Sequence, residues 1–218
     1  MIFLYKLRDM ETKTISPCSI NLLITFLLSC LLLISNIQSS VAATPVTTTK
    51  TSKTVYKNYL KTACNTTTYP KLCYNSLSPY TSTIKTNDLS LCNTALTITV
   101  KVAKNTSGLI KELSKRKGLS KSEAAVIKDC KDEISDSIDE LKQAIKALAS
   151  LKSSNSTAYV IDDIKTYVSA AITNDYTCLD GFEGMKVSAS LQSKIKKSVT
   201  NFASLTSNAL ALINKLEY

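Results

Sequence analysis

Apolar residues recur every three or four positions along four long stretches of the chain, which predicts four amphipathic helices. These stretches cover residues 87–117, 120–151, 156–178 and 188–217. The second stretch carries Ile127, Ile134 and Leu141 on one helical face. No segment alternates apolar and polar residues over a strand's length, and four glycines and four prolines are few for a fold built of β-turns. The pattern therefore predicts an all-α fold.

Short turns between the helices predict how they pack. Gly118 suits a left-handed helix C-terminus, and Ser120 with Glu123 forms a capping box that starts the next helix at once. Links this short favour antiparallel neighbours, so we expect an up-down-up-down four-helix bundle over residues 87–217. Residues 54–80 precede it as two short helical pieces separated at 65–68, with Pro70 in the first turn of the second piece. This segment is predicted to be an N-terminal helical hairpin.

Two pairs of cysteines have spacings that suit disulfides. Cys130 and Cys178 lie 24 residues on either side of Ser154, in the polar break between the second and third helices. If those helices double back there, the two sulfurs meet, so we expect a disulfide that joins the helix pair. Cys64 and Cys73 bracket the break in the hairpin, and a bridge between them would staple it.

The first 43 residues are predicted to be a secretory signal peptide. A lightly basic start leads into the apolar stretch 22–34, and a run of small residues at 40–43 suggests cleavage after Ala43. The alternative is a signal anchor, but Thr25 and Ser29 interrupt a stretch that falls short of the about 20 apolar residues of a membrane span. Residues 44–53 are Thr-rich without an apolar face, and we expect a flexible polar tail. The folded domain is expected over 54–218.

Five cysteines remain after residue 43, so at least one is left without a partner. Cys92 lies beside the apolar stripe of the first long helix. We interpret it as a small apolar residue of the core, with a reactive or intermolecular thiol as the alternative.

Composition excludes most catalytic chemistry. The chain has no histidine, which removes histidine-dependent nucleophilic catalysis, most zinc sites and the usual neutral-pH general base. Neighbouring carboxylates such as Asp132 and Glu133 point about 100° apart on a helix and do not converge on a substrate. The same holds for the pairs Asp139–Glu140 and Asp162–Asp163. We therefore predict that the protein is not an enzyme and binds neither cofactor nor metal.

The formal net charge is +10, and almost all of the cations are lysines. Nucleic-acid recognition favours arginine and stacked aromatics, which are not interleaved here, so no nucleic-acid partner is expected. An extracellular polyanion such as an acidic polysaccharide fits a secreted chain better, as a weak contact. Asn65, Asn105 and Asn155 begin N-glycosylation sequons, and Asn105 is the poorest candidate because it falls within a helix.

Several short motifs, taken in order, resemble the plant invertase and pectin methylesterase inhibitor family. The resemblance covers about residues 56–216. The matching segments are Thr68-Tyr69-Pro70-Lys71-Leu72-Cys73, Ile127-Lys128-Asp129-Cys130, Val168-Ser169-Ala170-Ala171-Ile172-Thr173, Thr177-Cys178-Leu179-Asp180-Gly181-Phe182 and Leu205-Thr206-Ser207-Asn208-Ala209-Leu210-Ala211-Leu212. The resemblance implies a four-helix bundle behind a helical hairpin, disulfides Cys64–Cys73 and Cys130–Cys178, and a free Cys92.

The resemblance also implies a function. It indicates a secreted, non-catalytic monomer of the cell wall or apoplast that binds an enzyme one-to-one and covers its active-site cleft. Segment 177–182 and segment 205–212 look more like the branch that inhibits pectin methylesterase, and the Pro-Lys-Phe tripeptide of the invertase branch is missing. An inhibitor of cell-wall or vacuolar invertase is the alternative. A non-inhibitory wall protein that binds pectin through its lysines, and a carrier with a ligand inside the bundle, are further alternatives.

The second and third long helices are expected to supply the surface that meets the enzyme. The candidate target-binding residues are those predicted to point outward from these helices: Lys131, Asp132, Ser135, Asp139, Lys142, Asp162, Lys165, Thr166, Ser169 and Thr173.

Overall fold

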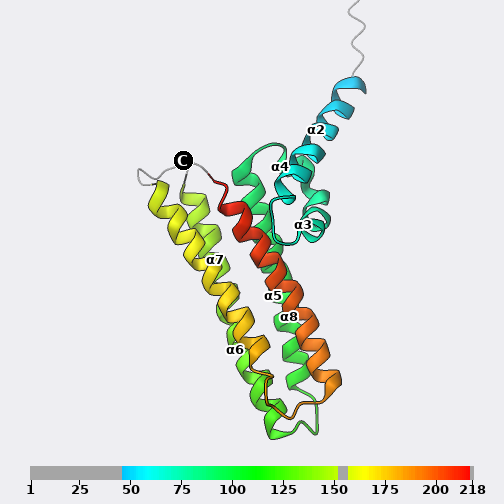
Figure 1. Ribbon diagram of the computed structural model, residues 1–218, viewed down its shortest axis with the longest axis vertical. Coiled ribbons are helices and arrows are strands. Elements are labelled where there is room, and N and C mark those ends of the chain that lie inside the picture. The colour runs from blue at the N-terminus through cyan, green and yellow to red at the C-terminus, as the bar shows by residue number, and fades with distance from the viewer. Residues whose placement is uncertain (1–45, 152–156, 217–218) are drawn as a thin grey trace, which may run out of the picture. The chain divides into compact units, whose positions relative to one another are not determined.

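A computed structural model describes residues 46–151 and 157–216, and every regular element in these ranges is helical. The elements are α2 (Val46–Cys64), α3 (Pro70–Leu77), the 3-10 turn η1 (Ser78–Tyr80), α4 (Thr81–Ile84), α5 (Asp88–Ser114), α6 (Lys121–Ser150), α7 (Thr157–Asp180) and α8 (Ala189–Ile213). The all-α prediction is confirmed. The four long helices, α5 to α8, follow the four apolar stretches of the sequence (Figure 1).

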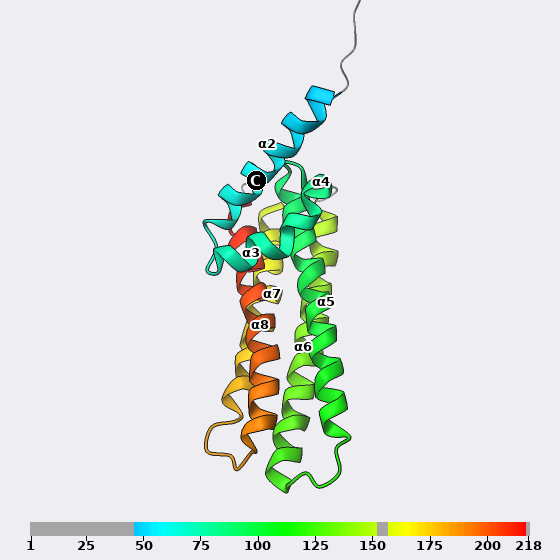
Figure 2. The ribbon, with the colours of Figure 1, turned by 90° about the vertical axis from the view of Figure 1, so that its right-hand side faces the viewer.

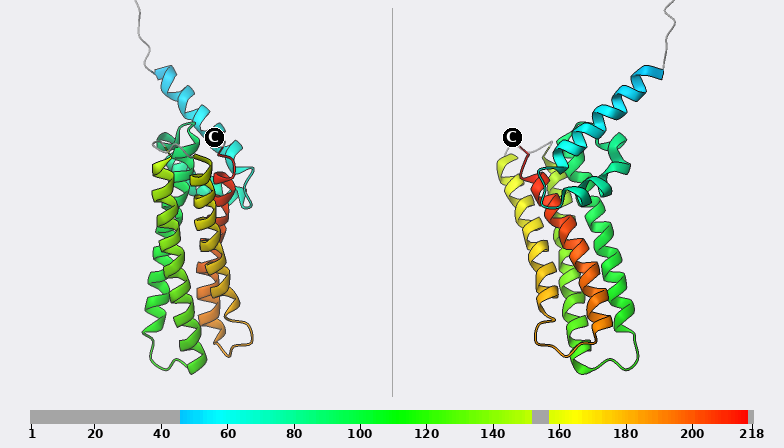
Figure 3. Two further views of the ribbon diagram at one scale, coloured as in Figure 1. Left: turned by 90° about the vertical axis from the view of Figure 1, so that its left-hand side faces the viewer. Right: turned by 45° about the vertical axis from the view of Figure 1, so that its right-hand side comes forward.

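The long helices form an antiparallel bundle in which neighbours along the chain are neighbours in space. α5 packs on α6, α6 on α7, α7 on α8, and α8 closes the ring against α5. The α5–α8 edge therefore lies opposite the α6–α7 edge. Figure 2 views the bundle from the first edge, and the left panel of Figure 3 views it from the second.

Each long helix turns its apolar stripe into a common core. Leu96, Ile134, Ile164 and Phe202, one from each helix, are completely buried. Burial of one such side chain stabilises the fold by about 2 kcal/mol, and the stripes repeat it along the whole bundle. Length and continuity of this core, more than helix propensity, hold the four helices together.

The helix boundaries follow local capping chemistry. The predicted capping box is present: the Glu123 backbone N–H donates to Ser120 Oγ, and Ser120 N–H donates to the Glu123 carboxylate. The second carboxylate oxygen of Glu123 accepts from Ser188 N–H, so this residue also ties the start of α6 to the N-cap of α8. These hydrogen bonds lower the pKa of Glu123 to about 2. Gly118 has a φ of 78°, as a left-handed turn requires.

The N-terminal hairpin differs from its prediction at its start. Helix α2 begins at Val46, inside the segment 44–53 that was expected to be a flexible polar tail. No glycine or proline interrupts the chain between Pro45 and Pro70, so the backbone can continue as helix without an apolar face. The anchored part of α2 is its second half, where Leu60 and Cys64 are buried.

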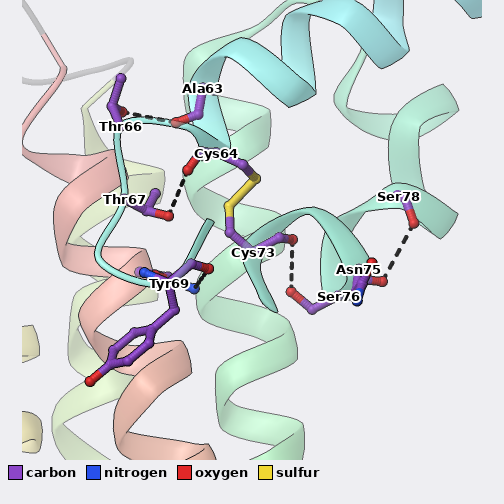
Figure 4. The surroundings of a disulfide bond; sticks show 10 residues. Ala63, Cys64, Thr66, Thr67, Tyr69, Cys73, Asn75, Ser76 and Ser78 are labelled. Carbon is purple, nitrogen blue, oxygen red and sulfur yellow. Dashed lines mark hydrogen bonds between the residues drawn. A yellow bond between two sulfur atoms is a disulfide. The ribbon is translucent and has the colours of Figure 1, made fainter. Parts of the chain in front are cut away.

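The hairpin is attached to the bundle at several points. The Cys64–Cys73 disulfide joins α2 to α3, and the Thr67 hydroxyl donates to the Cys64 carbonyl (Figure 4). The Tyr59 hydroxyl donates to the Asp88 carboxylate at the start of α5. Asn208 of α8, itself buried, forms a two-way contact with Tyr69: its Oδ1 accepts from the Tyr69 N–H at 2.8 Å, and its Nδ2 donates to the Tyr69 carbonyl at 3.0 Å. The loop between α2 and α3 is thus fixed to α8 through its backbone.

Candidate inhibitory surface on α6 and α7

The pairing of α6 with α7 is the most extensive helix packing in the described ranges, and it is covalently locked. The disulfide Cys130–Cys178 joins the two helices, with both residues buried and their Cα atoms 4.5 Å apart. This confirms the bridge expected from the symmetry of the two cysteines. The other end of the pair leads into residues 152–156, which are outside the described ranges.

The predicted target-binding residues all lie on the outer sides of these two helices. Lys165 is half-buried, and the other nine side chains are exposed. The disulfide and a hydrogen bond from the Ser137 hydroxyl to the Ala171 carbonyl at 3.1 Å set the register between the helices. In this register Asp139 and Ser169 lie at the same level, as do Lys142 and Thr166.

Residues at the two ends of the candidate set are not brought together. Lys131 and Asp132 lie at the disulfide end of the pair, whereas Asp162 lies about 21 Å further along it, toward residues 152–156. The middle of the pair, where four polar residues from two helices lie at similar heights, is therefore the compact part of the candidate surface.

Several charges on this surface are neutralised within their own helix. Lys142 Nζ lies 2.8 Å from the Asp139 carboxylate, and Lys128 Nζ lies 3.0 Å from Asp132. Lys165 and Asp162 form a longer pair at 3.7 Å. Because these pairs are exposed, each contributes little to stability. At the centre of the surface, the Lys142–Asp139 pair carries no net charge.

A second set of carboxylates on α6 was not among the candidates. Asp129, Glu133, Asp136 and Glu140 recur at spacings of four, three and four, and none forms an ion pair in the described part of the chain. Partial burial raises the pKa of Glu133, and repulsion by Asp136, Asp129 and Asp132 raises it further. The spacing was visible in the sequence, but the absence of lysine partners was not.

A buried polar cluster lies beneath the surface, and sequence reasoning did not find it. Asp175 of α7 is completely buried between Ser137 of α6 and Thr206 of α8. The Ser137 hydroxyl lies 3.0 Å from Asp175 Oδ1, and the Thr206 hydroxyl lies 3.4 Å from Oδ2. Both hydroxyls also lie near a helix carbonyl, that of Ala171 at 3.1 Å and that of Phe202 at 3.0 Å.

Counting hydrogens shows which form of Asp175 this cluster favours. Each hydroxyl has one hydrogen and two possible acceptors, so the two hydroxyls cannot satisfy the carboxylate and both carbonyls at once. A protonated Asp175 supplies the missing hydrogen and removes a buried charge that no cation faces in the described ranges. Burial raises the pKa of Asp175 to about 8, and the two hydroxyls counteract only part of that rise.

The remaining predicted residues are placed as follows. Cys92 is the free cysteine of the described ranges and is buried on α5, as the core interpretation predicts. Burial, with a smaller contribution from Asp88, raises the pKa of its thiol to about 12, so it is not a reactive thiolate. Asn65 is exposed after α2, Asn105 is exposed within α5, and Asn155 lies outside the described ranges.

Comparison with known proteins assigns the chain to a family. The model of the plant invertase/pectin methylesterase inhibitor family matches residues 58–212, which takes in the hairpin, both disulfides and nearly all of the bundle. The chain belongs to this family. Its members are inhibitors of enzymes. This agrees with a sequence that has no histidine for nucleophilic catalysis.

Relatives and one solved structure support the membership. The chain is 44% identical to pectinesterase inhibitor 10 of Arabidopsis thaliana over 159 residues, which is 72% of this chain but only half of that relative. It is 41% identical to pectinesterase inhibitor 4 of Arabidopsis thaliana over 174 residues, covering 79% of this chain and 85% of the relative. A crystal structure of a mutant pectin methylesterase inhibitor from Arabidopsis is similar with a TM-score of 0.56 and 25% identity, over 72% of this chain and 97% of that one.

Two further observations on the described residues concern metal binding and membrane insertion. No group of three or more His, Cys, Asp or Glu side chains in the described ranges is placed to hold a metal ion. No helix in these ranges has the length and apolar character that crossing a membrane demands.

Proposed function

We propose that this family member is a secreted inhibitor of pectin methylesterase. It binds the enzyme one-to-one, covers the active-site cleft, and so limits the demethylation of pectin in the plant cell wall. Relatives named pectinesterase inhibitors support the choice of target. The observation that carries the proposal is the disulfide-locked α6–α7 pair with its polar outer surface.

A rigid helix pair suits this role because a surface that is already ordered loses little conformational entropy when it binds the enzyme. Side chains that are already fixed by packing lose less conformational entropy on binding, and a rigid backbone adds no further loss. The disulfide and the buried Ser137–Asp175–Thr206 cluster hold α6, α7 and α8 in one arrangement from inside the bundle. We place the centre of the contact at Asp139, Lys142, Thr166 and Ser169, which lie at the same height along the helix pair.

The target is tested by titrating the purified protein into a plant pectin methylesterase and, separately, into an acid invertase at mildly acidic pH. We expect loss of esterase activity that is complete at one equivalent, with invertase unaffected. Inhibition of invertase alone assigns the chain to the other branch of the family. Inhibition of neither enzyme refutes the proposed function.

The surface is tested by the double charge reversal Asp139→Lys with Lys142→Glu, which keeps the net charge and the local ion pair. Because the few residues that contribute over 1 kcal/mol cluster near the centre of an interface, changing two central residues should weaken inhibition at least about tenfold. The matched control exchanges Glu112 and Lys115, an exposed pair at 2.7 Å at the end of α5. If the Asp139/Lys142 variant inhibits as strongly as the Glu112/Lys115 control, the contact lies elsewhere on the protein.

Secretion is tested on the N-terminus of the protein recovered from plant cell medium. We expect it to begin near Thr44, within a few residues, after removal of the signal peptide. A protein that keeps residues 1–43 and stays with the membrane fraction contradicts this part of the proposal.

A further inference from the structure

Charge is divided unevenly between the two edges of the bundle. Of the chain's 17 Asp and Glu residues, seven are on α6 and four on α7, whereas α5 has two and α8 has none. α5 and α8 together carry six lysines. A chain of net charge +10 thus places most of its carboxylates on α6 and α7, the pair assigned to the enzyme, and leaves α5 and α8 basic. Figures 2 and 3 show these two helix pairs on opposite sides of the bundle.

Five exposed lysines lie on α5 and α8. They are Lys101, Lys104, Lys111, Lys194 and Lys197. None forms an ion pair within the described ranges, and the chain has no carboxylate between residues 89 and 111 or between 184 and 216. The acidic residue next to the edge, Glu112, is already paired with Lys115.

The lysines of the two helices lie at similar heights along the bundle. The hydroxyls of Thr106 on α5 and Ser198 on α8 are 2.9 Å apart, which fixes the register of this antiparallel pair. In this register Lys111 is level with Lys194, and Lys104 and Lys197 lie within one helical turn of each other. At 1.5 Å per residue the set extends about 15 Å along the bundle, so the charges are spread along it and do not form a single anion pocket.

Lysines without neighbouring arginines, exposed aromatic residues or an exposed apolar face indicate which kind of polyanion these helices bind. Nucleic-acid surfaces add arginine forks and stacking aromatics, and none of the exposed aromatics in the described ranges lies on α5 or α8. Membrane-surface helices add an exposed apolar face, and none of the exposed large hydrophobic residues of these ranges lies on α5 or α8 either. A soluble polymer with regularly spaced carboxylates needs only the lysines.

We propose that the α5–α8 lysines bind a carboxylate-bearing polysaccharide, demethylated pectin, while the α6–α7 edge is occupied by the enzyme. The choice of polymer rests on the proposed function, because demethylated pectin is the product of the inhibited reaction. Since the two edges face away from each other, both partners fit at once. The inhibitor is thereby concentrated where demethylation has already occurred.

The experiment compares two variants that lose equal charge. One carries Lys101→Gln, Lys104→Gln, Lys194→Gln and Lys197→Gln; the control carries the same change at Lys53, Lys57, Lys61 and Lys71, which are exposed on the hairpin. Retention on polygalacturonate is measured at low ionic strength and at about 0.15 M salt, where the screening length is about 8 Å. Fully methyl-esterified pectin is the uncharged reference polymer. Asn105 lies among these lysines, so all proteins are deglycosylated first.

We expect the wild type to be retained on polygalacturonate but not on esterified pectin, and released by salt. The α5–α8 variant should bind at least about tenfold more weakly, and the hairpin control less than about twofold. Equal loss in both variants shows that only net charge matters and overturns the proposal. Equally tight binding to duplex DNA or anionic vesicles at the same salt overturns the choice of polymer.

Titration of pectin methylesterase with both variants separates this inference from the proposed function. The α5–α8 variant should inhibit as the wild type does, because the changed residues are on the opposite edge. Polymer binding without any inhibition by the wild type refutes the proposed function and leaves the lysine edge in place. Inhibition that falls in parallel with polymer binding refutes the separation of the two edges.

Discussion

The buried carboxyl of Asp175 predicts an unusual dependence of stability on pH. Most carboxylates that are paired in a folded protein make it more stable as pH rises through the acid range. Asp175 has the opposite effect, because burial between Ser137 and Thr206 raises its pKa to about 8. The variant Asp175→Asn keeps the shape of the side chain and can no longer ionise.

The sign follows from proton binding in the two states. The unfolded chain releases this proton near its ordinary pKa of about 4, while the folded chain holds it to about pH 8. Between these values the folded state binds more protons than the unfolded state, so its free energy of unfolding falls by about 1.4 kcal/mol per pH unit. The full contribution, about 6 kcal/mol, is present below pH 4 and is lost once the pH passes 8. This is comparable to the whole stability of a typical domain.

Equilibrium urea unfolding followed by circular dichroism, at each pH from 5 to 8, measures the effect. This window is clear of most other titrations, because the chain has no histidine and the Cys92 thiol has a pKa of about 12. We expect the wild type to lose stability steadily across it and Asp175→Asn to stay nearly constant. At pH 8 the variant should be the more stable protein.

The control is Asp163→Asn, which makes the same chemical change at an exposed position of the same helix. It should follow the wild-type curve at every pH. Parallel curves for the wild type and Asp175→Asn refute the reasoning, since they mean that Asp175 is ionised in the folded protein throughout the window.

Three further predictions concern single contacts. Replacing Cys130 and Cys178 together by serine opens a loop of about 49 residues and should lower the free energy of unfolding by about 4 kcal/mol, measured by urea unfolding; an unchanged midpoint contradicts it. Asn208→Ala leaves both backbone groups of Tyr69 without their partner and should cost about 2 kcal/mol, with faster amide exchange in residues 65–69; Ser207→Ala, its half-buried neighbour, is the control. Cys92 should react with a thiol reagent only in denaturant, and labelling of the native protein at a rate unaffected by denaturant disproves its burial.

The bundle could be predicted from sequence because its determinants are local or repeated. Ser120 and Glu123 are three residues apart and mark the start of α6 by themselves, and the apolar stripes repeat over six or more turns. The symmetric positions of Cys130 and Cys178 added one long-range contact. What could not be predicted was the start of α2, because nothing in a Thr- and Lys-rich segment decides between helix and tail.

Polar residues of the interior were missed for a different reason. Asp175 occupies a core position of α7, and whether a carboxyl is tolerated there depends on hydroxyls from positions 137 and 206. The Asn208 contact with Tyr69 likewise joins residues 139 positions apart. Neither partner carries a local signal, so such contacts become visible only once the helices are placed.

Burial of Cys92 has a consequence for how the protein matures. Five cysteines of the described chain enter an oxidising compartment if the protein is secreted, but only four of them pair. Cys64 and Cys73, nine residues apart, can meet as soon as the hairpin is synthesised, whereas Cys130 waits 48 residues for Cys178. During that interval Cys92 is the competing thiol. In the folded protein Cys92 is buried and cannot exchange, so the native set of disulfides requires that Cys92 be packed before it is oxidised.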